Sequence, residues 1–362
     1  MIRWCRTCLM PSTRPRVVFD ASGQCNACIW AFEHKPKIDW EARHEELLAL
    51  AHDHAAHPGP WNCVVPFSGG KDSATVAWKL RDAGFRPLLV CYGQLIWTNV
   101  GRRNLHRVAD AGFDIHYWRV NQVVSRKLTR RFFIERGHPK NAYDAAVNAV
   151  PIQTAEAFGI PLVFYAEHGE REYGGHILSE NSSKERDLAE ILENQIGDDP
   201  RNWATDGISE YELAPYIPPA TWKAKILYAS HFWRWSIYDN ALFAKQKYGF
   251  ETLKRSIGSF EGHDSIDDYM DDLDIYMMFI KFGFGRAVRM ASRMIQNGHM
   301  TREEGLALVR QYDGEFPTAR LPKFLKYMQM KRPEFDQTVD QHRNPELWEQ
   351  VEGTWKLRFP PV

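Results

Sequence analysis

The sequence predicts an α/β fold built around a parallel sheet, because short apolar runs alternate along the chain with segments of helical periodicity. A turn with two adjacent glycines directly follows the first apolar run, at a position where such sheets hold ligands. The 362 residues, 44% of them hydrophobic, suffice for a core spread over two or three structural units. Strands that alternate with helices favour right-handed crossovers and helices on both faces of the sheet.

Four apolar runs have the length and composition of buried strands. They span residues 63–67, 87–92, 115–120 and 162–166. Pro66 in the first run has no N–H to donate to a neighbouring strand. We therefore expect that strand to end there, or to place the proline where no ladder hydrogen bond is needed.

Helices are expected before, between and after these strands. The expected helices span 39–53, 73–83 and, behind an N-cap at Thr98, 99–111. Gly84 ends the second of them. Much later, Thr301 and Glu304 fit a capping box ahead of another helix.

The chain is expected to divide into three units. Residues 1–38 form a cysteine module, residues 39–178 an α/β nucleotide-binding domain, and residues 179–362 a mainly helical domain that binds the substrate. The last division rests on a change of composition beyond Gly169, from alternating apolar runs to polar, then aromatic, then helical sequence.

Four of the six cysteines form two CxxC pairs, separated by sixteen residues. They are Cys5, Cys8, Cys25 and Cys28. Each CxxC turn aims two thiolates at one point, so the spacing predicts a structural Zn²⁺ site with no open position for water. Two disulfides or free thiols are the alternative, which would suit an oxidising compartment.

Lys plus Arg and Asp plus Glu number 46 each, so no global field draws the chain to nucleic acid or to an anionic membrane. No run approaches the roughly 18 apolar residues of a membrane helix, and the N-terminus lacks the apolar core of a signal peptide. We expect a cytoplasmic protein without a membrane partner, and nucleic acid is not an expected partner.

The glycine turn has the sequence SGGKDS, residues 68–73. Gly69 and Gly70 let consecutive N–H groups point inward, and the hydroxyls of Ser68 and Ser73 add donors at the start of a helix. This arrangement suits a pyrophosphate group. The spacing differs from the Walker A loop, and the plain alternative is a tight turn without a ligand.

A run of acidic residues in the second half has two interpretations. Its members are Asp264, Asp267, Asp268, Asp271, Asp272 and Asp274. They could hold Mg²⁺, but the apolar residues that alternate with them favour the solvated face of an amphipathic helix.

SGGKDS resembles the PP-loop, the signature of the N-type ATP pyrophosphatase superfamily. Other stretches that carry a resemblance are CRTCLMPSTRP and CNAC near the N-terminus, AEHGEREYGG (166–175), HFWRWSIYDNALFAKQKYGF (231–250) and KFGFGRAVRMASRMIQNGHMTREEGLALV (281–309). Together they are similar, almost end to end, to the N-acetyl sugar amidotransferases of bacterial surface-polysaccharide biosynthesis. The branch acting on pseudaminic or legionaminic acid resembles the chain most.

The resemblance implies the PP-loop ATP pyrophosphatase fold (adenine nucleotide alpha hydrolase-like) and a reaction in which ATP adenylates the acetamido oxygen of a nucleotide-activated sugar. Ammonia then displaces AMP to leave an acetamidino group. ATP and Mg²⁺ would be held by the loop residues Ser68, Gly69, Gly70, Lys71, Asp72 and Ser73, with Cys91 and Tyr92 beside the adenine. Lys71 would neutralise the leaving pyrophosphate, and Asp72 would orient the loop or the Mg²⁺ shell; alternatively, Asp72 only complements the helix dipole.

The substrate side is expected in two later segments. Glu167, His168 and Glu170 follow the fourth strand, and Glu170 or His168 is the candidate that takes the ammonia proton. The further candidates for substrate binding are Glu167, Tyr173, Gly174, Gly175, Lys281 and Arg286. Support of the fold is the alternative role for each.

No glutaminase motif is evident, because Cys63 and Cys91 lie in expected core strands and the second residue is Ile2. We expect ammonia from a separate glutaminase, with a cyclase-like channel subunit as a further possible partner. The competing functions are the same chemistry on a UDP-linked 2,3-diacetamido uronic acid, a tRNA-modifying PP-loop enzyme, and a zinc-bearing assembly protein without turnover.

Overall fold

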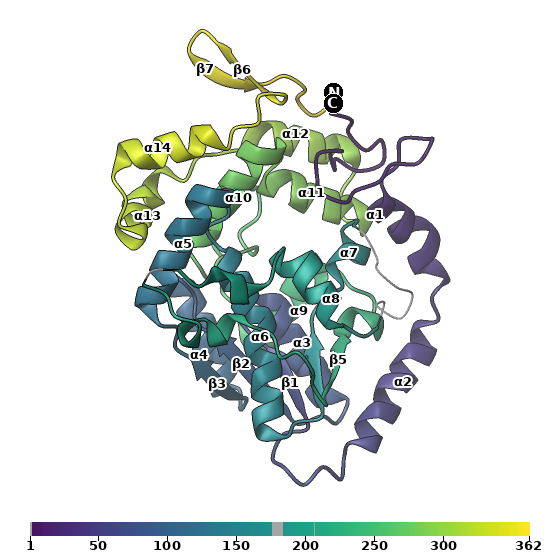
Figure 1. Ribbon diagram of the computed structural model, residues 1–362. Coiled ribbons are helices and arrows are strands. Elements are labelled where there is room, and N and C mark those ends of the chain that lie inside the picture. Colours follow the sequence, from purple (N-terminus) through teal and green to yellow (C-terminus); the bar gives the residue numbers. More distant parts are fainter. Residues whose placement is uncertain (1, 176–183, 206) are drawn as a thin grey trace.

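A five-stranded parallel sheet forms the centre of the molecule. The computed structural model describes residues 2–175, 184–205 and 207–362. The strand order is β3-β2-β1-β4-β5, and every neighbouring pair is parallel (Figure 1). The strands are β1 (Cys63–Pro66), β2 (Pro87–Tyr92), β3 (Asp114–Trp118), β4 (Leu162–Tyr165) and β5 (Lys225–Tyr228). The parallel sheet and the positions of its first four strands confirm the prediction.

Pro66 is the last residue of β1, as its missing N–H requires. The next residue, Phe67, donates its N–H to the carbonyl of Val90 at 2.9 Å, so β1 and β2 stay paired up to the start of the glycine turn. Within this sheet, the strand that the sequence did not predict is β5, a run of only four residues that extends the sheet beyond β4.

Helices cover both faces of the sheet. Val64, Leu88 and Val163 pack on one face with α5 and α6, whereas Val65 and Leu89 pack on the other with α2, α3 and α4. This alternation is the period-two pattern of a sheet buried on both sides. The helices are α2 (Trp40–Asp53), α3 (Lys71–Asp82), α4 (Asn99–Asp110), α5 (Gln122–Arg136), α6 (Asn141–Phe158) and α9 (Ile237–Tyr248).

Thr98 accepts a hydrogen bond from the N–H of Gly101 as the N-cap of α4, which confirms the expected cap. The predicted helix 73–83 begins two residues earlier, at Lys71, so the last residues of SGGKDS belong to the first turn of α3.

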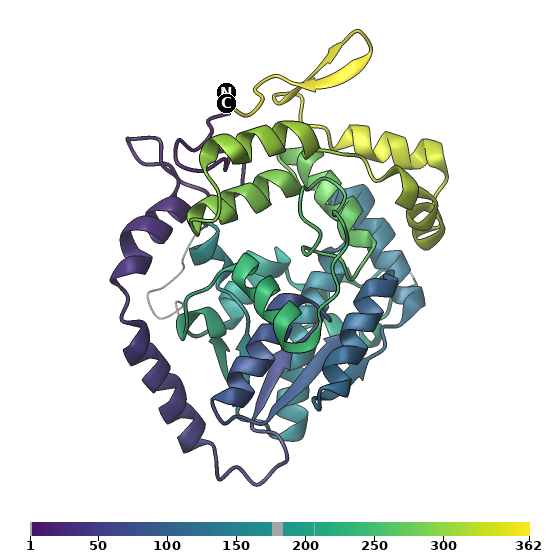
Figure 2. The ribbon, with the colours of Figure 1, turned by 180° about the vertical axis from the view of Figure 1, so that it is seen from behind.

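The C-terminal helices gather at one end of the molecule, together with the N-terminal residues (Figures 1 and 2). Thr301 and Glu304 form the predicted capping box of α12. The elements are α10 (Met270–Phe282), α11 (Arg286–Gln296), α12 (Arg302–Tyr312), α13 (Leu321–Met328), α14 (Arg332–Gln341) and the antiparallel pair β6 (Trp348–Val351) and β7 (Thr354–Leu357).

The cysteine module shares its core with this C-terminal group. Cys5, Cys8, Cys25 and Cys28 are buried in one cluster with Ala287, Val288 and Ala291 of α11. The boundary between 178 and 179 lies outside the described residues, and the division into three units stays a prediction.

Short helical segments complete the description. They are α1 (Asn26–Ile29), η1 (Trp30–His34), η2 (Lys35–Lys37), α7 (Gly169–Glu172), α8 (Leu188–Glu190), η4 (Ile191–Ile196), η5 (Pro200–Trp203), η6 (Tyr211–Tyr216), η7 (Ala229–His231) and η8 (Thr318–Arg320). Across the described residues, each helix is too short or too polar to cross a lipid bilayer.

Candidate active site and metal centre

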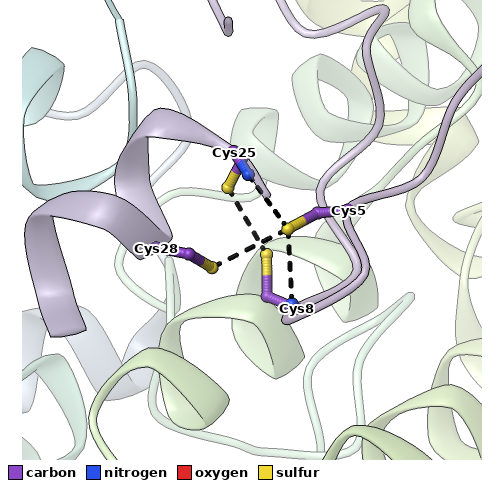
Figure 3. Close-up of side chains that lie close together, drawn as sticks. All are labelled: Cys5, Cys8, Cys25 and Cys28. Atoms are coloured by element: carbon purple, nitrogen blue, oxygen red, sulfur yellow. Dashed lines mark hydrogen bonds between the residues drawn. The ribbon is translucent and has the colours of Figure 1, made fainter. Parts of the chain in front are cut away.

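The four cysteines of the CxxC pairs converge on one point. Their Sγ atoms all lie within 4.8 Å of one another, and all four side chains are fully buried (Figure 3). The Sγ atoms of Cys5 and Cys28 are 3.8 Å apart, and those of Cys8 and Cys25 are 3.7 Å apart. A tetrahedron with Zn–S bonds of about 2.3 Å needs an S–S separation of about 3.8 Å, so the site fits Zn²⁺. None of the four cysteines forms a disulfide, which excludes the disulfide alternative.

Hydrogen-bond donors surround the sulfur atoms. The N–H groups of Cys8 and Cys25 point at Cys5 Sγ, at 3.5 and 3.2 Å. Gln296, the last residue of α11, donates from Nε2 to the Sγ atoms of Cys8 and Cys28, both at 3.6 Å. Such donors stabilise thiolates and orient metal ligands. The metal centre is therefore attached to the C-terminal end of α11.

The glycine turn lies between the end of β1 and the start of α3. Gly69 has φ +93, a conformation that L side chains rarely adopt, and a Cβ there would lie 3.2 Å from the carbonyl oxygen of Gly101 in α4. The N–H of Gly70 donates to Ser68 Oγ at 3.2 Å, and Ser73 Oγ donates to the Gly70 carbonyl at 3.3 Å. The first N–H groups of α3, which have no intrahelical partner, give this turn the positive potential that an anion requires.

Lys71 and Asp72 are held by the structure rather than free in solvent. Lys71 Nζ pairs with Asp72 Oδ2 at 2.8 Å, and Lys71 is 4% exposed. Burial alone would lower the pKa of Lys71, but Asp72 and then Asp264 raise it above its usual value. Asn240 of α9, a residue that sequence reasoning missed, donates from Nδ2 to Asp72 Oδ1 at 2.8 Å. Both carboxylate oxygens of Asp72 thus have fixed partners.

A cavity of about 320 Å³ opens beside the turn. Its polar lining combines Lys71 and Lys140 with acidic residues from the expected amphipathic segment. The lining residues used below are Ser68, Gly70, Asp72, Ser73, Gln94, Asp264, Asp267 and Asp271. A smaller cavity of about 180 Å³ adjoins the same serines and is bordered by Tyr92.

The interpretation of the acidic run as a solvated helix face is wrong. Helix α10 begins only at Met270, and Asp264, Asp267 and Asp268 precede it as buried residues. Asp268 accepts hydrogen bonds from the N–H groups of Leu95 and Ile96, both at 2.9 Å. The acidic side chains face inward because buried or partly buried cations and N–H groups from distant parts of the chain meet them there.

Two of these aspartates have perturbed acidity beside the turn. Burial, followed by the charge of Asp271, raises the pKa of Asp267 to about 7. Burial acts on Asp264 in the same direction, but the cations Arg289 and Lys71 hold its pKa below the usual value. Among the described residues, the cysteines are the only acidic or metal-ligating group close enough to form a complete cage. The aspartates beside the turn do not form such a group by themselves.

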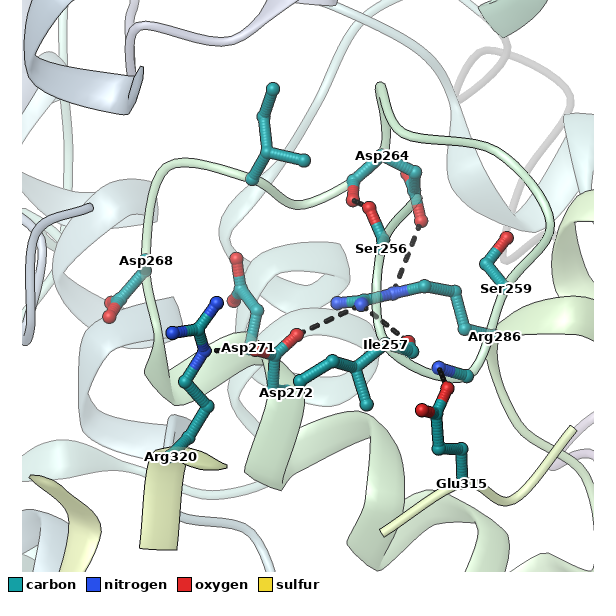
Figure 4. Close-up of polar contacts among 12 residues, drawn as sticks. Ser256, Ile257, Ser259, Asp264, Asp268, Asp271, Asp272, Arg286, Glu315 and Arg320 are labelled. Carbon is teal, nitrogen blue, oxygen red and sulfur yellow. Dashed lines mark hydrogen bonds and ion pairs between the residues drawn. The ribbon is translucent and has the colours of Figure 1, made fainter. Parts of the chain in front are cut away.

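Three arginines follow one another on α11 at positions 286, 289 and 293. Arg286 is 1% exposed; Nη1 donates to the Ile257 carbonyl at 2.8 Å and pairs with Asp272 at 2.9 Å (Figure 4). Arg286 does not line the cavity beside the turn. These contacts join α10 to α11, so Arg286 supports the fold, which is the alternative to substrate binding given in the sequence analysis.

Arg289 and Arg293, further along α11, are electrostatically coupled to charged residues near the turn, and Arg286 reaches Asp264 at 4.0 Å. The Arg293 guanidinium lies 3.6 Å from the centroid of the Tyr173 ring. Burial lowers the pKa of Arg293, but the charges of Tyr173 and Asp264 raise it above its usual value. Burial, followed by the charge of Arg293, lowers the pKa of Arg289. Neither pairs with a carboxylate within 4.0 Å in the described chain. The spacing RAVRMASR, with i, i+3 and i+7 on one helix face, was the signal that could have found them.

The segment after β4 divides between the turn and the cysteine module. Glu167 accepts a hydrogen bond from Tyr173 Oη at 3.0 Å, and burial, followed by the charge of Asp72, raises its pKa. Glu170 instead pairs with Arg16 at 2.7 Å. His168 is 2% exposed, stacks on Tyr228 with 4.5 Å between centroids, and has its pKa lowered to about 4 by burial. Glu167 is electrostatically coupled to Asp72 of the turn.

The remaining predicted substrate residues hold backbone contacts. Gly174 has φ +76, and its carbonyl accepts a hydrogen bond from Arg14, while the Gly175 carbonyl accepts from Asn26 Nδ2 at 3.0 Å. Lys281 Nζ donates to the Arg136 carbonyl at 2.7 Å. Of the two residues expected beside the adenine, Cys91 is fully buried in β2, and Tyr92 donates from Oη to Tyr216 Oη at 3.3 Å. None of these five residues lines the 320 Å³ cavity, and Tyr92 lines the smaller one.

No curated protein matches the chain. Residues 234–359 match the family model described as "LPS biosynthesis protein WbpG-like, C-terminal domain". The matched segment runs from just before α9 to the end of β7, and so includes Asn240, the α11 arginines and the helices that carry the acidic residues. About the last third of the chain is therefore similar to the C-terminal domain of a family of lipopolysaccharide-biosynthesis proteins.

Proposed function

We propose that the protein is an ATP-dependent amidotransferase that converts an acetamido group of a nucleotide-activated sugar to an acetamidino group. The observation that carries the proposal is the SGGKDS turn, which lies between the carboxyl end of β1 and the start of α3, next to a polar cavity, and contains the ion pair of buried Lys71 with Asp72. Similarity of the C-terminal part to a lipopolysaccharide-biosynthesis family supports a sugar substrate for surface polysaccharide, O-antigen or flagellin glycan.

An amide oxygen is a weak nucleophile, so the reaction needs positioning and a stabilised leaving group. In the proposed reaction this oxygen attacks the α-phosphate of ATP, pyrophosphate departs, and ammonia displaces AMP. The N–H groups of the turn and Lys71 hold the pyrophosphate end. Mg²⁺ would neutralise phosphate charge, with Asp72, Asp267 and Asp271 as its candidate ligands.

The proton that ammonia must lose is assigned to Glu167 rather than to His168 or Glu170. The reasons are the raised pKa of Glu167 and its coupling to Asp72. Arg293, close to the same carboxylate, supplies positive charge for an acidic sugar or for the departing pyrophosphate.

The nitrogen donor is proposed to be ammonia from a separate glutaminase, with or without a cyclase-like channel subunit. Cys63 and Cys91 are both fully buried strand residues, and burial raises the pKa of each thiol. Neither suits a glutaminase nucleophile. The purified chain should therefore turn over with ammonium and leave glutamine intact.

The direct test incubates the full chain with ATP, Mg²⁺, ammonium and a panel of sugars. The panel contains CMP-linked pseudaminic and legionaminic acids and UDP-linked 2,3-diacetamido uronic acids. We expect sugar-dependent release of pyrophosphate and a product lighter by the difference between O and NH in the mass spectrum. Pyrophosphate release that requires tRNA instead of any sugar would contradict the proposal.

A further inference from the structure

A second, larger cavity lies next to the turn and has no role in the reaction described so far. Its volume is about 890 Å³, and it is bordered by the loop after β2, by α4, by the end of β3, by α5 and by α13. We call it the basic groove. It is lined by Gln94, Leu95, Ile96, Trp97, Arg102, Tyr117, Arg119, Val120, Gln122, Arg126, Lys323, Lys326, Tyr327 and Gln329.

The charged residues that line this groove are all positive. Five cations line it, namely Arg102, Arg119, Arg126, Lys323 and Lys326, and no Asp or Glu is among its lining residues. In the part of the chain that the structure describes, none of the five forms an ion pair within 4.0 Å. The chain as a whole carries no net charge, so a local excess of this size favours an anionic ligand.

Flat aromatic surfaces stand beside the cations. Trp97 Nε1 donates to Tyr117 Oη at 3.2 Å, which fixes the two rings relative to each other. A Cβ on Gly93 would lie 2.6 Å from the same Oη, so the glycine leaves the space that the Tyr117 hydroxyl occupies. Tyr117 is 44% exposed, and Arg126 lies 5.6 Å from the centroid of the Tyr327 ring. Aromatic faces next to cations suit a heteroaromatic base joined to phosphate.

The groove is connected to the turn through Gln94. This residue lines both cavities, and its Nε2 donates to the Ser68 carbonyl at 3.3 Å and to Asp267 at 2.7 Å. The basic groove and the cavity beside the turn are therefore neighbours that share Gln94 in their walls. In contrast, Lys281 and Arg286 hold contacts inside the fold.

We propose that the basic groove binds the pyrimidine nucleotide part of the activated sugar. The phosphate lies against the cations of α5 and α13, the base against Trp97 and Tyr117, and the sugar points past Gln94 toward the turn. This assignment rests on the proposed function for the identity of the ligand. A cavity of about 890 Å³ lies within the range of about 300–1,000 Å³ that is typical of small-molecule sites, which favours a nucleotide over a folded RNA.

Isothermal titration calorimetry with UDP and CMP tests the groove without turnover. We expect both nucleotides to bind the full chain, and the double variant Lys323→Glu/Lys326→Glu to bind about tenfold more weakly or worse. Trp97→Ala should weaken the binding of UDP and CMP but leave the binding of inorganic pyrophosphate unchanged. The matched control is Lys37→Glu/Lys245→Glu, which makes the same charge change at exposed residues outside the groove and should bind as the wild type does.

Competition with a non-hydrolysable ATP analogue separates the two sites. UDP binding that persists in saturating analogue supports a distinct groove, whereas displacement of UDP overturns the proposal by making the groove part of the ATP site. Tight tRNA binding that Lys323→Glu/Lys326→Glu removes, with no binding of UDP or CMP, also overturns it. If UDP and CMP bind as expected but no sugar is turned over, the groove stands and the proposed reaction fails.

Discussion

At the scale of single residues, the site depends on side chains whose partners are fixed by other elements. Asp72 is bound by its neighbour Lys71 and by Asn240 from α9. The two contacts leave the carboxylate oriented before any ligand arrives. Preorganised charge of this kind contributes more to catalysis than charge that must first rearrange.

Asp72→Asn should abolish most turnover while the protein stays folded. The amide keeps an oxygen for Asn240 but loses the charge that pairs with Lys71 and that a metal ion would require. We expect a fall of about 100-fold or more in the rate of sugar-dependent pyrophosphate release. Circular dichroism and the Tm should stay close to wild type, and Asp110→Asn on α4 is the control at an exposed aspartate. Full activity in Asp72→Asn would contradict the assignment.

The burial of His168 predicts how the free energy of unfolding depends on pH. Its pKa is about 4 in the folded protein, below the usual value, because burial disfavours the imidazolium. The unfolded chain therefore binds the proton more readily between pH 4 and pH 6.5, so this residue lowers the free energy of unfolding as pH falls through that range. The loss is up to about 2 kcal/mol between pH 7 and pH 5.

His168→Asn keeps an acceptor at the N-cap of α7 but cannot titrate. Urea unfolding at pH 7 and at pH 5 should show a smaller fall for this variant than for the wild type. Equal pH dependence in the two proteins would mean that His168 is not buried in its neutral form. A catalytic role for His168 would instead change the pH profile of turnover without changing that of unfolding.

At the scale of elements, patterns confined to one segment were predicted correctly, and contacts between distant segments were not. The strand β2 and the caps at Thr98 and Thr301 follow from local periodicity and hydrogen bonding. The four-residue strand β5 has no pattern of its own, and only pairing with β4 defines it.

The acidic run shows why the rest could not be predicted. The apolar alternation around it is real, but the partners that bring the aspartates inward come from elsewhere in the chain: Lys140 meets Asp271, His138 lies near Asp274, and Arg286 meets Asp272. For the site, the turn and the cysteine cluster were evident from the sequence. Asn240, Arg293 and the basic groove required the tertiary structure.

The conformation of the turn gives a prediction with a matched control. Gly69 and Gly84 have nearly the same φ, +93 and +97. A Cβ on Gly69 would lie 3.2 Å from the Gly101 carbonyl, whereas a Cβ on Gly84 would meet nothing within 4 Å. Gly84→Ala should cost only backbone strain, about 1–2 kcal/mol in the free energy of unfolding. Gly69→Ala should cost as much and also displace the turn from α4, so ATP affinity should fall only in that variant. Equal ATP affinity in both variants would contradict the role of the turn.

At the scale of the whole molecule, the metal centre and the candidate active site belong to one packed assembly. The N-terminal cysteines share a core with α11, and the same helix carries Gln296 beside the sulfur atoms and Arg293, whose charge acts on Glu167 and Asp72. The cysteine cluster and the surroundings of the turn are thus connected through one helix.

Removal of the metal should therefore affect more than the N-terminus. We expect one zinc per chain by metal analysis, loss of zinc in Cys25→Ser, and retention in the control Cys63→Ala, whose sulfur lies in β1 away from the cluster. Cys25→Ser should lower the Tm and raise the KM for the sugar in the proposed reaction. A zinc-free variant with an unchanged Tm would contradict the structural role of the metal.

The hydrogen bonds from Gln296 to two sulfur atoms connect the end of α11 to the cysteine cluster. If the cluster holds zinc, a cell starved of zinc would make a chain in which the cluster no longer holds Arg289 and Arg293 of α11 in place. Under the proposed function, the surface glycans of such a cell would carry less of the amidino modification.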